Sequence, residues 1–266
     1  MLRPPAVAGA FYPADAVLLR QMVTGFLQDG TPEEGVEGDG IKALIVPHAG
    51  YIYSGAIAGR AYGLLAGQAR RIRRVVLVGP VHRVAVRGLA LPGADKFATP
   101  IGEIAVDQGG VAKIAGMAQV VVSEEAHALE HSLEVQLPFL QSVLGSFTLV
   151  PLAVGNCTAE EVADVLEALW GGDETLIVIS SDLSHFLAQE TAERVDGETV
   201  ARILHGEPLY SFEQACGALP INGLMLAAAR HHLAPRLVAR GNSGDAGGER
   251  ARVVGYAAIE FCGHEG

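Results

Sequence analysis

The chain has 266 residues, of which 50% are hydrophobic and 18% charged, so it is long enough to bury the core of one large α/β domain. Its formal net charge of −11 argues against a nucleic-acid partner, because a polyanion is bound through clustered Lys and Arg side chains. The three cysteines are too scattered for a disulfide framework and no apolar run approaches the length of a membrane span, so we expect a cytoplasmic protein without a membrane partner.

Five runs rich in apolar and β-branched residues predict β-strands. In chain order they are residues 42–47, 74–79, 147–154, 175–181 and 252–261. Helical patterns are found at residues 123–144, 158–170 and 222–233. The first has a leucine stripe with Pro138 as a kink, and the second opens on a capping box formed by Thr158 and Glu161. The Gly-rich residues 29–40 and 241–248 predict surface loops.

The alternation of strands and helices predicts an α/β fold in which helices cover both faces of a mostly parallel or mixed sheet. No internal repeat and no linker divides the chain, so we expect a single domain over residues 1–266. In open sheets of this kind, functional groups gather beyond the carboxyl ends of the strands, because the loops there vary while the sheet holds their bases in place.

Polar side chains follow three of the predicted strands at the point where each strand ends. His48 follows the first strand, His82 lies three residues past the second, and Asp182 and His185 follow the fourth. Imidazoles bind Zn, Fe, Cu and Ni well, and two histidines with one anionic ligand leave coordination positions open for a substrate. The joint placement therefore predicts a metal site, although a single histidine after a strand is more often a hydrogen-bonded core residue.

Spacing leaves the third ligand of this site open among three residues. Asp182 could bind the ion directly, or it could orient a metal-bound histidine through a hydrogen bond. Cys216 precedes a predicted helix, whose positive end lowers the pKa of a thiol and favours the metal-binding thiolate. Cys157 has a similar position between the third strand and the capped helix.

A competing motif is formed by His127, Glu130 and His131, which match the H-x-x-E-H pattern of inverted zincin peptidases. The match is short, and these residues also form the polar side of the helix predicted over residues 123–144. We therefore interpret them as a polar helix face in preference to a zinc peptidase site.

Several motifs together resemble the Memo family, grouped in prokaryotes as protein B of the AmmeMemoRadiSam system. The matching stretches, in chain order, are AGAFYP, PHAGYIYSG, VGPVH, FATPIGEIAVD, EHSLEVQLPFL, SSDLSH, ACG and SGDAGGERARVVGYAAIEF. They extend over nearly the whole chain. The resemblance implies a single three-layer α/β/α domain similar to the class III extradiol dioxygenases, which use non-haem Fe(II).

The resemblance also implies roles for individual residues. The metal ligands would be His48, His82 and Cys216, and His185 with Asp182 would handle protons as the catalytic pair. Tyr53 would line the pocket that holds the bound group. A thiolate in place of a carboxylate ligand shifts the metal preference toward copper or a redox role, so Fe(II) or copper is expected ahead of zinc.

Three functions follow from this resemblance. The first is a metal-dependent oxidoreductase of the dioxygenase type that takes a small molecule or peptide in its metal pocket. The second is a non-enzymatic module that binds a peptide or another protein in a groove lined by Phe11, Tyr12 and Tyr53. The third is an accessory component of a modification system linked to a radical-SAM protein.

Overall fold

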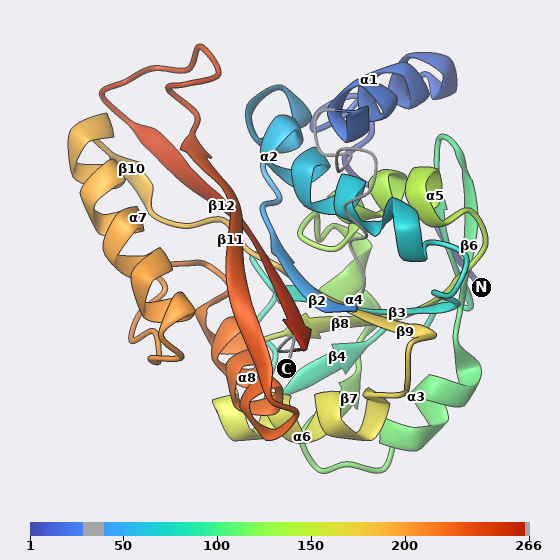
Figure 1. The fold of residues 1–266 in the computed structure, drawn as a ribbon. Coiled ribbons are helices and arrows are strands. Elements are labelled where there is room, and N and C mark those ends of the chain that lie inside the picture. Colours follow the sequence, from blue (N-terminus) through green and yellow to red (C-terminus); the bar gives the residue numbers. More distant parts are fainter. Residues whose placement is uncertain (29–39, 264–266) are drawn as a thin grey trace.

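Four parallel strands form the centre of the sheet in the computed structural model, which describes residues 1–28 and 40–263 (Figure 1). Their spatial order is β8 (Thr148–Val154), β3 (Arg74–Pro80), β9 (Thr175–Ser180) and β2 (Ile41–Val46). Each agrees with a predicted strand to within one residue at either end. The predicted loop at 29–40 lies outside the described residues except for Gly40.

Further strands extend this centre on both sides, and some of them are antiparallel, so the sheet is mixed. The predicted last strand is β12 (Val253–Gly263), which pairs antiparallel with β2 and with the unpredicted β11 (Leu233–Asn242). The short β10 (His185–Leu187) also pairs with β12. On the other side lie β6 (Gly102–Val106), β5 (Lys96–Thr99), β1 (Leu2–Arg3), β4 (Leu89–Leu91) and β7 (Val120–Val122). The described residues thus form one sheet of twelve strands, and the α/β class is confirmed.

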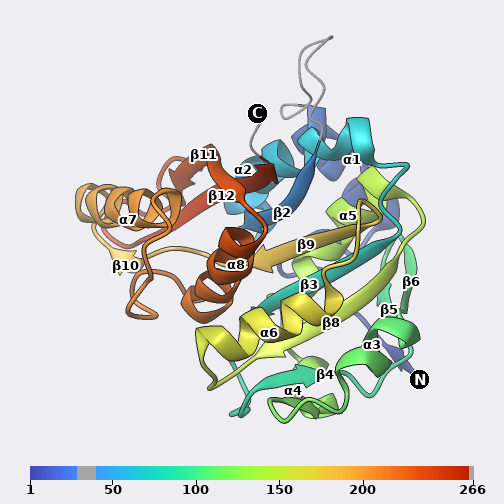
Figure 2. The same cartoon turned by 60° about the horizontal axis from the view of Figure 1, so that its bottom comes forward.

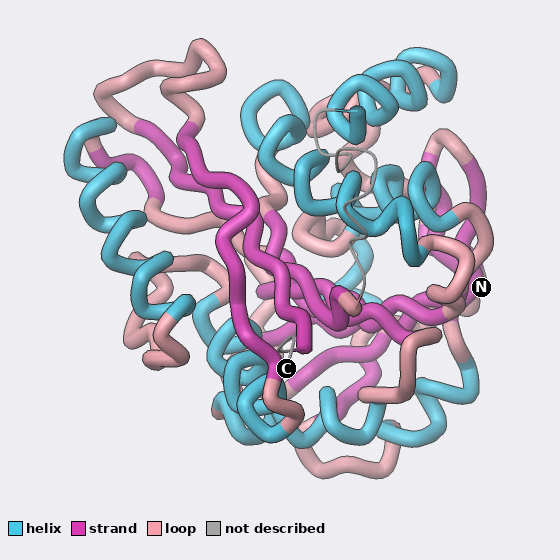
Figure 3. The backbone as a smooth tube through the Cα atoms, in the orientation of Figure 1, coloured by secondary structure: helices cyan, strands magenta, loops and turns pink. Residues whose placement is uncertain are grey.

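Helices cover both faces of the sheet, as Figures 2 and 3 show. One face carries α1 (Ala16–Gln28), α2 (Tyr51–Gly63), the short 3-10 helix η1 (Leu64–Gln68) and α5 (Leu137–Leu144). The other carries α3 (Gln108–Ile114), α6 (Ala159–Leu169) and α8 (Ala218–Arg230). A further helix, α7 (Gln189–Leu204), packs beside β11 and β12. Within the described ranges, no helix has both the length and the apolar composition that crossing a membrane requires.

Alternate residues of each central strand belong to different cores. In β9, Leu176 and Val178 pack with the first group of helices, whereas Ile177 and Ile179 pack with the second. All four side chains are fully buried. A strand covered on both faces needs apolar residues at every position, which explains the uninterrupted apolar runs in the sequence.

The helix predicted over residues 123–144 is wrong in its middle. The chain forms α4 (Glu124–Ala128), leaves the helix, and resumes with the short 3-10 helix η2 (Glu134–Gln136) and then α5. Glu130 causes the break, because its side chain accepts the backbone N–H groups of His131 and Ser132 that a continuing helix would bond to carbonyls. Leu129 accordingly leaves the apolar stripe and is 61% exposed.

The other two predicted helices are present. The capping box at the start of α6 is complete, since the Thr158 hydroxyl accepts the Glu161 N–H and the Glu161 carboxylate accepts the Thr158 N–H. The predicted helix 222–233 is α8, which begins four residues earlier and ends before β11 takes up the chain.

A buried carboxylate fixes the first residues of the chain to the segment that contains η2. Glu134 is fully buried and pairs with the Arg3 guanidinium. It also accepts the Tyr12 hydroxyl and the backbone N–H groups of Ala6 and Val7. This set of bonds satisfies a buried charge and holds the amino-terminal segment against the sheet edge where the site lies.

Candidate metal centre

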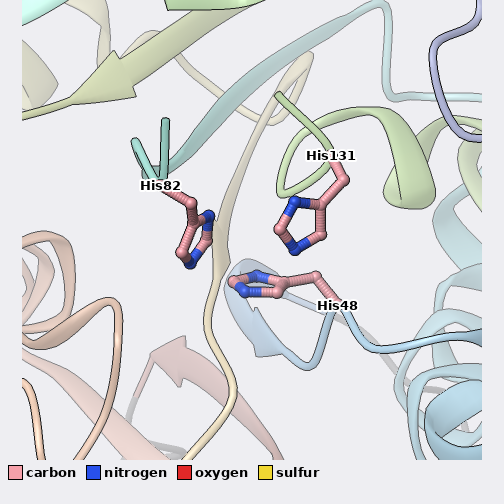
Figure 4. Close-up of side chains that lie close together, drawn as sticks. All are labelled: His48, His82 and His131. Carbon is pink, nitrogen blue, oxygen red and sulfur yellow. The ribbon is translucent and has the colours of Figure 1, made fainter. Parts of the chain in front are cut away.

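Three histidines converge beyond the carboxyl ends of the central strands. His48 follows β2, His82 follows β3, and His131 lies in the break between α4 and η2. One nitrogen from each ring can be chosen so that all three lie within 4.8 Å of one another. Figure 4 shows the three rings facing a common space. This is the arrangement that a single metal ion requires of its ligands.

The ring positions follow from the parallel pairing of the strands. Because β2 and β3 both pair in parallel with β9, their carboxyl ends reach the same edge of the sheet. The ring centroids of His48 and His82 are 5.3 Å apart, those of His48 and His131 are 5.3 Å apart, and those of His82 and His131 are 4.7 Å apart. Phe11 packs on the far side of His131 at 4.8 Å between ring centroids.

A hydrogen-bond network fixes the tautomer of His48. Ser180 donates its only hydroxyl proton to the Ser132 carbonyl oxygen over 2.6 Å. The same hydroxyl oxygen lies 2.8 Å from Nε2 of Gln136 and 2.9 Å from Nδ1 of His48. Gln136 Nε2 also donates to the Pro47 carbonyl at 2.9 Å, which sets the orientation of the amide. Since the hydroxyl proton is already used, Nδ1 of His48 is the donor, and the neutral ring keeps its lone pair on Nε2.

Glu130 fixes His82 in the same way. One carboxylate oxygen lies 2.9 Å from Nδ1 of His82, and the other accepts the His82 backbone N–H at 2.6 Å. Burial opposes ionisation of Glu130, but hydrogen bonds from the His82 ring and from backbone N–H groups outweigh it and lower the pKa of the carboxyl to about 2. The carboxylate therefore accepts from Nδ1 and leaves Nε2 of His82 with a lone pair, as second-sphere carboxylates do for metal-bound histidines.

Burial keeps two of the rings neutral. It lowers the pKa of His48 well below the ordinary value, and the neighbouring His131 and His82 add to the effect. Burial likewise lowers the pKa of His131 to about 4. Neutral imidazoles at pH 7 can offer their lone pairs to a metal ion without first losing a proton.

Cys216 lies next to His48, with its Sγ 3.3 Å from Nε2 of that ring. Metal bonds of about 2.0 Å to nitrogen and about 2.3 Å to sulfur would place two ligands at this separation when the angle between them is about 100°, close to tetrahedral. Sγ does not belong to the group of ligand atoms within 4.8 Å of one another that the described residues form. The structure thus brings Cys216 to His48, and His131 to both other histidines.

The pKa of Cys216 differs from the low value expected for a thiol at the amino terminus of a helix. Cys216 does precede α8, but burial, followed by the Asp182 carboxyl, raises the pKa of the thiol to about 12. Loss of hydration and the nearby carboxyl outweigh the hydrogen bonds from Ser181 and from backbone N–H groups that favour the thiolate. In the absence of a metal ion Cys216 is therefore a thiol, and a metal would have to displace its proton.

The residues predicted to handle protons lie near the centre but do not pair with each other. Asp182 is buried and accepts the His48 backbone N–H at 2.7 Å, and burial raises its pKa to about 7. His185 is half-buried, and burial lowers its pKa although a hydrogen bond to the Leu183 backbone opposes this. No hydrogen bond joins Asp182 to His185 in the described part of the chain.

The remaining sequence-based candidates lie outside the cluster. Tyr53, at the start of α2, is 39% exposed. Cys157 follows β8 and is not among the clustered ligands. His127 is buried, with Nε2 2.8 Å from the Ala90 carbonyl oxygen and the Phe97 ring beside it, so the H-x-x-E-H residues do not form one helical metal site. Tyr12 is only 3% exposed and cannot line the groove expected for a binding module.

A cleft of about 710 Å³ opens beside the centre. His82 and Cys216 both line it, together with the segment from Pro80 to Val86, residues at the end of β8, and Phe212. The volume falls within the range of small-molecule sites. A ligand in this cleft would contact two of the candidate metal ligands.

Sequence reasoning missed His131, Glu130 and Ser180. The H-x-x-E-H match contains the first two, but the continuous leucine stripe predicts that they lie on the polar face of a helix. The signal for the break is the polar run Glu130-His131-Ser132, whose side-chain acceptor competes with helical hydrogen bonds. Ser180 is the last residue of a buried strand, and no local pattern separates it from an ordinary core serine.

Known proteins resemble this chain over nearly its full length. A family model described as Memo-like protein matches residues 3–260. MEMO1 family proteins of Aeropyrum pernix and Metallosphaera sedula are 35% and 33% identical, over 97% and 98% of this chain and 99% of each relative. The crystal structure of an uncharacterized protein from Escherichia coli K12 shares the fold, with a TM-score of 0.55, 14% identity, and coverage of 83% of this chain and 99% of that one. The chain therefore belongs to the Memo-like protein family.

Proposed function

We propose that this protein binds a redox-active transition-metal ion, iron or copper, and acts as a metal-dependent oxidoreductase of the dioxygenase-like type. The observation that supports this most directly is the convergence of His48 and His82, each with Nδ1 held by a separate hydrogen-bond partner. Nitrogens fixed in this way pay little entropy to bind an ion.

We assign His48 and His82 as the shared ligands of the ion. We assign His131 as a third ligand because it belongs to the same cluster of nitrogen atoms, and Cys216 as a fourth because its sulfur lies close to His48. Imidazoles with a thiolate suit copper and iron better than Mg²⁺ or Ca²⁺, which prefer oxygen ligands. When bound, the ion would supply one-electron chemistry and a positive charge at the end of the cleft.

The protein residues around the ion would position the substrate and its protons. The cleft admits a small molecule beside His82 and Cys216. His185 is half-buried near the cluster and holds a neutral ring, so it can accept a proton from a bound substrate. Asp182 positions the His48 backbone and carries a second exchangeable proton.

Metal analysis of protein purified without chelators tests the proposal. The wild type should retain about one equivalent of iron or copper, and the His48→Ala variant should retain little. His127→Ala is the matched control, because His127 is equally buried but lies outside the cluster. Equal metal in the wild type and His48→Ala would refute the site.

A redox experiment separates an oxidoreductase from a structural metal protein. The copper-loaded protein should pass through repeated cycles of ascorbate reduction and air oxidation with its metal content and absorption spectrum restored. Loss of the metal in the first cycle would count against redox chemistry while leaving metal binding intact.

A further inference from the structure

The walls of the cleft beside the metal centre are mostly apolar. Its lining includes seven apolar side chains, those of Pro80, Val81, Val84, Ala85, Val86, Val154 and Phe212. Phe212 is 64% exposed. A surface of this kind favours a ligand with an apolar or aromatic body.

Arg83 supplies the positive charge in this lining. No Asp or Glu is among the described residues that line the cleft, although the chain has a net charge of −11. Asn156 is the other polar side chain there apart from the candidate metal ligands. A cleft with a guanidinium and no carboxylate is complementary to an anion.

The guanidinium of Arg83 has no ion-pair partner among the described residues, whereas Arg3 and Arg74 are paired with Glu134 and Asp107. Its charge nevertheless acts on the metal centre. Burial is the largest cause of the low pKa of His131, and the charge of Arg83 contributes to it. Arg83 lines the same cleft as His82 and Cys216, so one small ligand can contact it together with two of the candidate metal ligands.

We propose that the cleft binds a small organic anion, with Arg83 pairing to its carboxylate and the apolar walls holding its body beside His82 and Cys216. Asn156 can donate a hydrogen bond to the same ligand through its amide. That this anion is the substrate depends on the proposed metal-dependent function. The anion subsite itself does not depend on it.

Binding of 3-phenylpropanoate, compared with its neutral isostere 3-phenylpropanamide, tests the subsite. We expect the wild-type protein to prefer the carboxylate by about tenfold, the lower end of what a charged hydrogen bond contributes. Arg83→Gln should lose this preference, and Arg83→Lys should retain part of it, because a lysine keeps the charge but not the planar fork. Calorimetry or ligand-observed NMR measures both affinities.

Arg87→Gln is the matched control. Arg87 is an exposed arginine four residues further along the chain, and it does not line the cleft. Arg87→Gln changes the net charge as much as Arg83→Gln does. Because Arg87 lies outside the cleft, this variant should keep the wild-type preference for the carboxylate. If both variants weaken carboxylate binding equally, the effect is long-range and the subsite is refuted.

Measurements on chelator-treated and metal-loaded protein separate this proposal from the proposed function. A carboxylate preference that persists without metal and disappears in Arg83→Gln supports the subsite, even if the chain proves to bind no metal. A preference that appears only with metal and survives in Arg83→Gln means that the ion binds the anion, and it refutes the role of Arg83. Competition by inorganic phosphate at equal affinity would refute an organic ligand.

Discussion

Replacing Glu130 by Gln tests whether the carboxylate prepares His82 for a metal ion. The side chain is 3% exposed and accepts four hydrogen bonds, from the ring and backbone of His82 and the backbone of His131 and Ser132. An amide at this position turns one acceptor into a donor, so at least one buried N–H loses its partner. The variant should bind the metal about 10- to 100-fold more weakly, as expected when a second-sphere carboxylate is lost.

The loss of unfolding free energy expected in Glu130→Gln follows from the pKa of Glu130. The fall from the ordinary value of 4.5 to about 2 corresponds to about 3 kcal/mol of stabilisation in the ionised form. Because the folded-state pKa is the lower one, this contribution is complete above pH 4.5 and is lost as the pH falls toward 2. The difference in unfolding free energy between wild type and Glu130→Gln should therefore be at most about 3 kcal/mol at pH 7, because the part that comes from the charge of His82 requires a protonated ring, and it should shrink below pH 4.5.

Urea denaturation at several pH values measures the stability, and competition with a chromophoric chelator measures the metal affinity. Glu134→Gln is the control, since Glu134 is equally buried and accepts several hydrogen bonds but none from a histidine. It should lose stability with a much smaller loss of metal affinity. If folded Glu130→Gln binds metal as tightly as the wild type, the carboxylate does not prepare His82.

Three further substitutions examine the rest of the site. Ser180→Ala removes the acceptor of the His48 Nδ1 proton. Metal affinity should therefore fall about tenfold, and the unfolding free energy should fall by about 1 to 2 kcal/mol. Unchanged affinity in a chelator competition would show that the tautomer of His48 does not affect metal binding. His131→Gln should weaken metal binding at least tenfold, and Cys216→Ser should abolish the sulfur-to-copper charge-transfer absorption of the copper(II) protein. A spectrum identical to that of the wild type would exclude Cys216 from the coordination sphere.

The central sheet could be predicted from the sequence because it is buried on both faces. The run Leu176-Ile177-Val178-Ile179 is apolar at every position, and that continuity marks a covered strand whatever its neighbours are. The edge strands are different. β11 is largely exposed or half-buried along Leu233–Asn242, so its pattern carries little signal and its pairing with β12 is set by tertiary contacts.

The histidines that follow strands could likewise be predicted, because strand ends determine their place. His48 and His82 are brought together by two parallel pairings with β9. His131 could not be placed in this way, since its position depends on a helix break that arises from hydrogen bonds of Glu130 to the following backbone. The protonation state of Cys216 also could not be predicted, because burial raises its pKa while local hydrogen bonds lower it, and only coordinates show which effect is larger.

The carboxylate of Glu134 has a consequence for the order in which the chain folds. It joins Tyr12 and Arg3 to a residue more than 120 positions later, so these amino-terminal groups have no partner on a growing polypeptide until half of it has been synthesised. The contact between Phe11 and His131 is consequently closed over 120 positions of the chain. Completion of the ion-binding pocket should thus wait until the segment around Glu134 is in place.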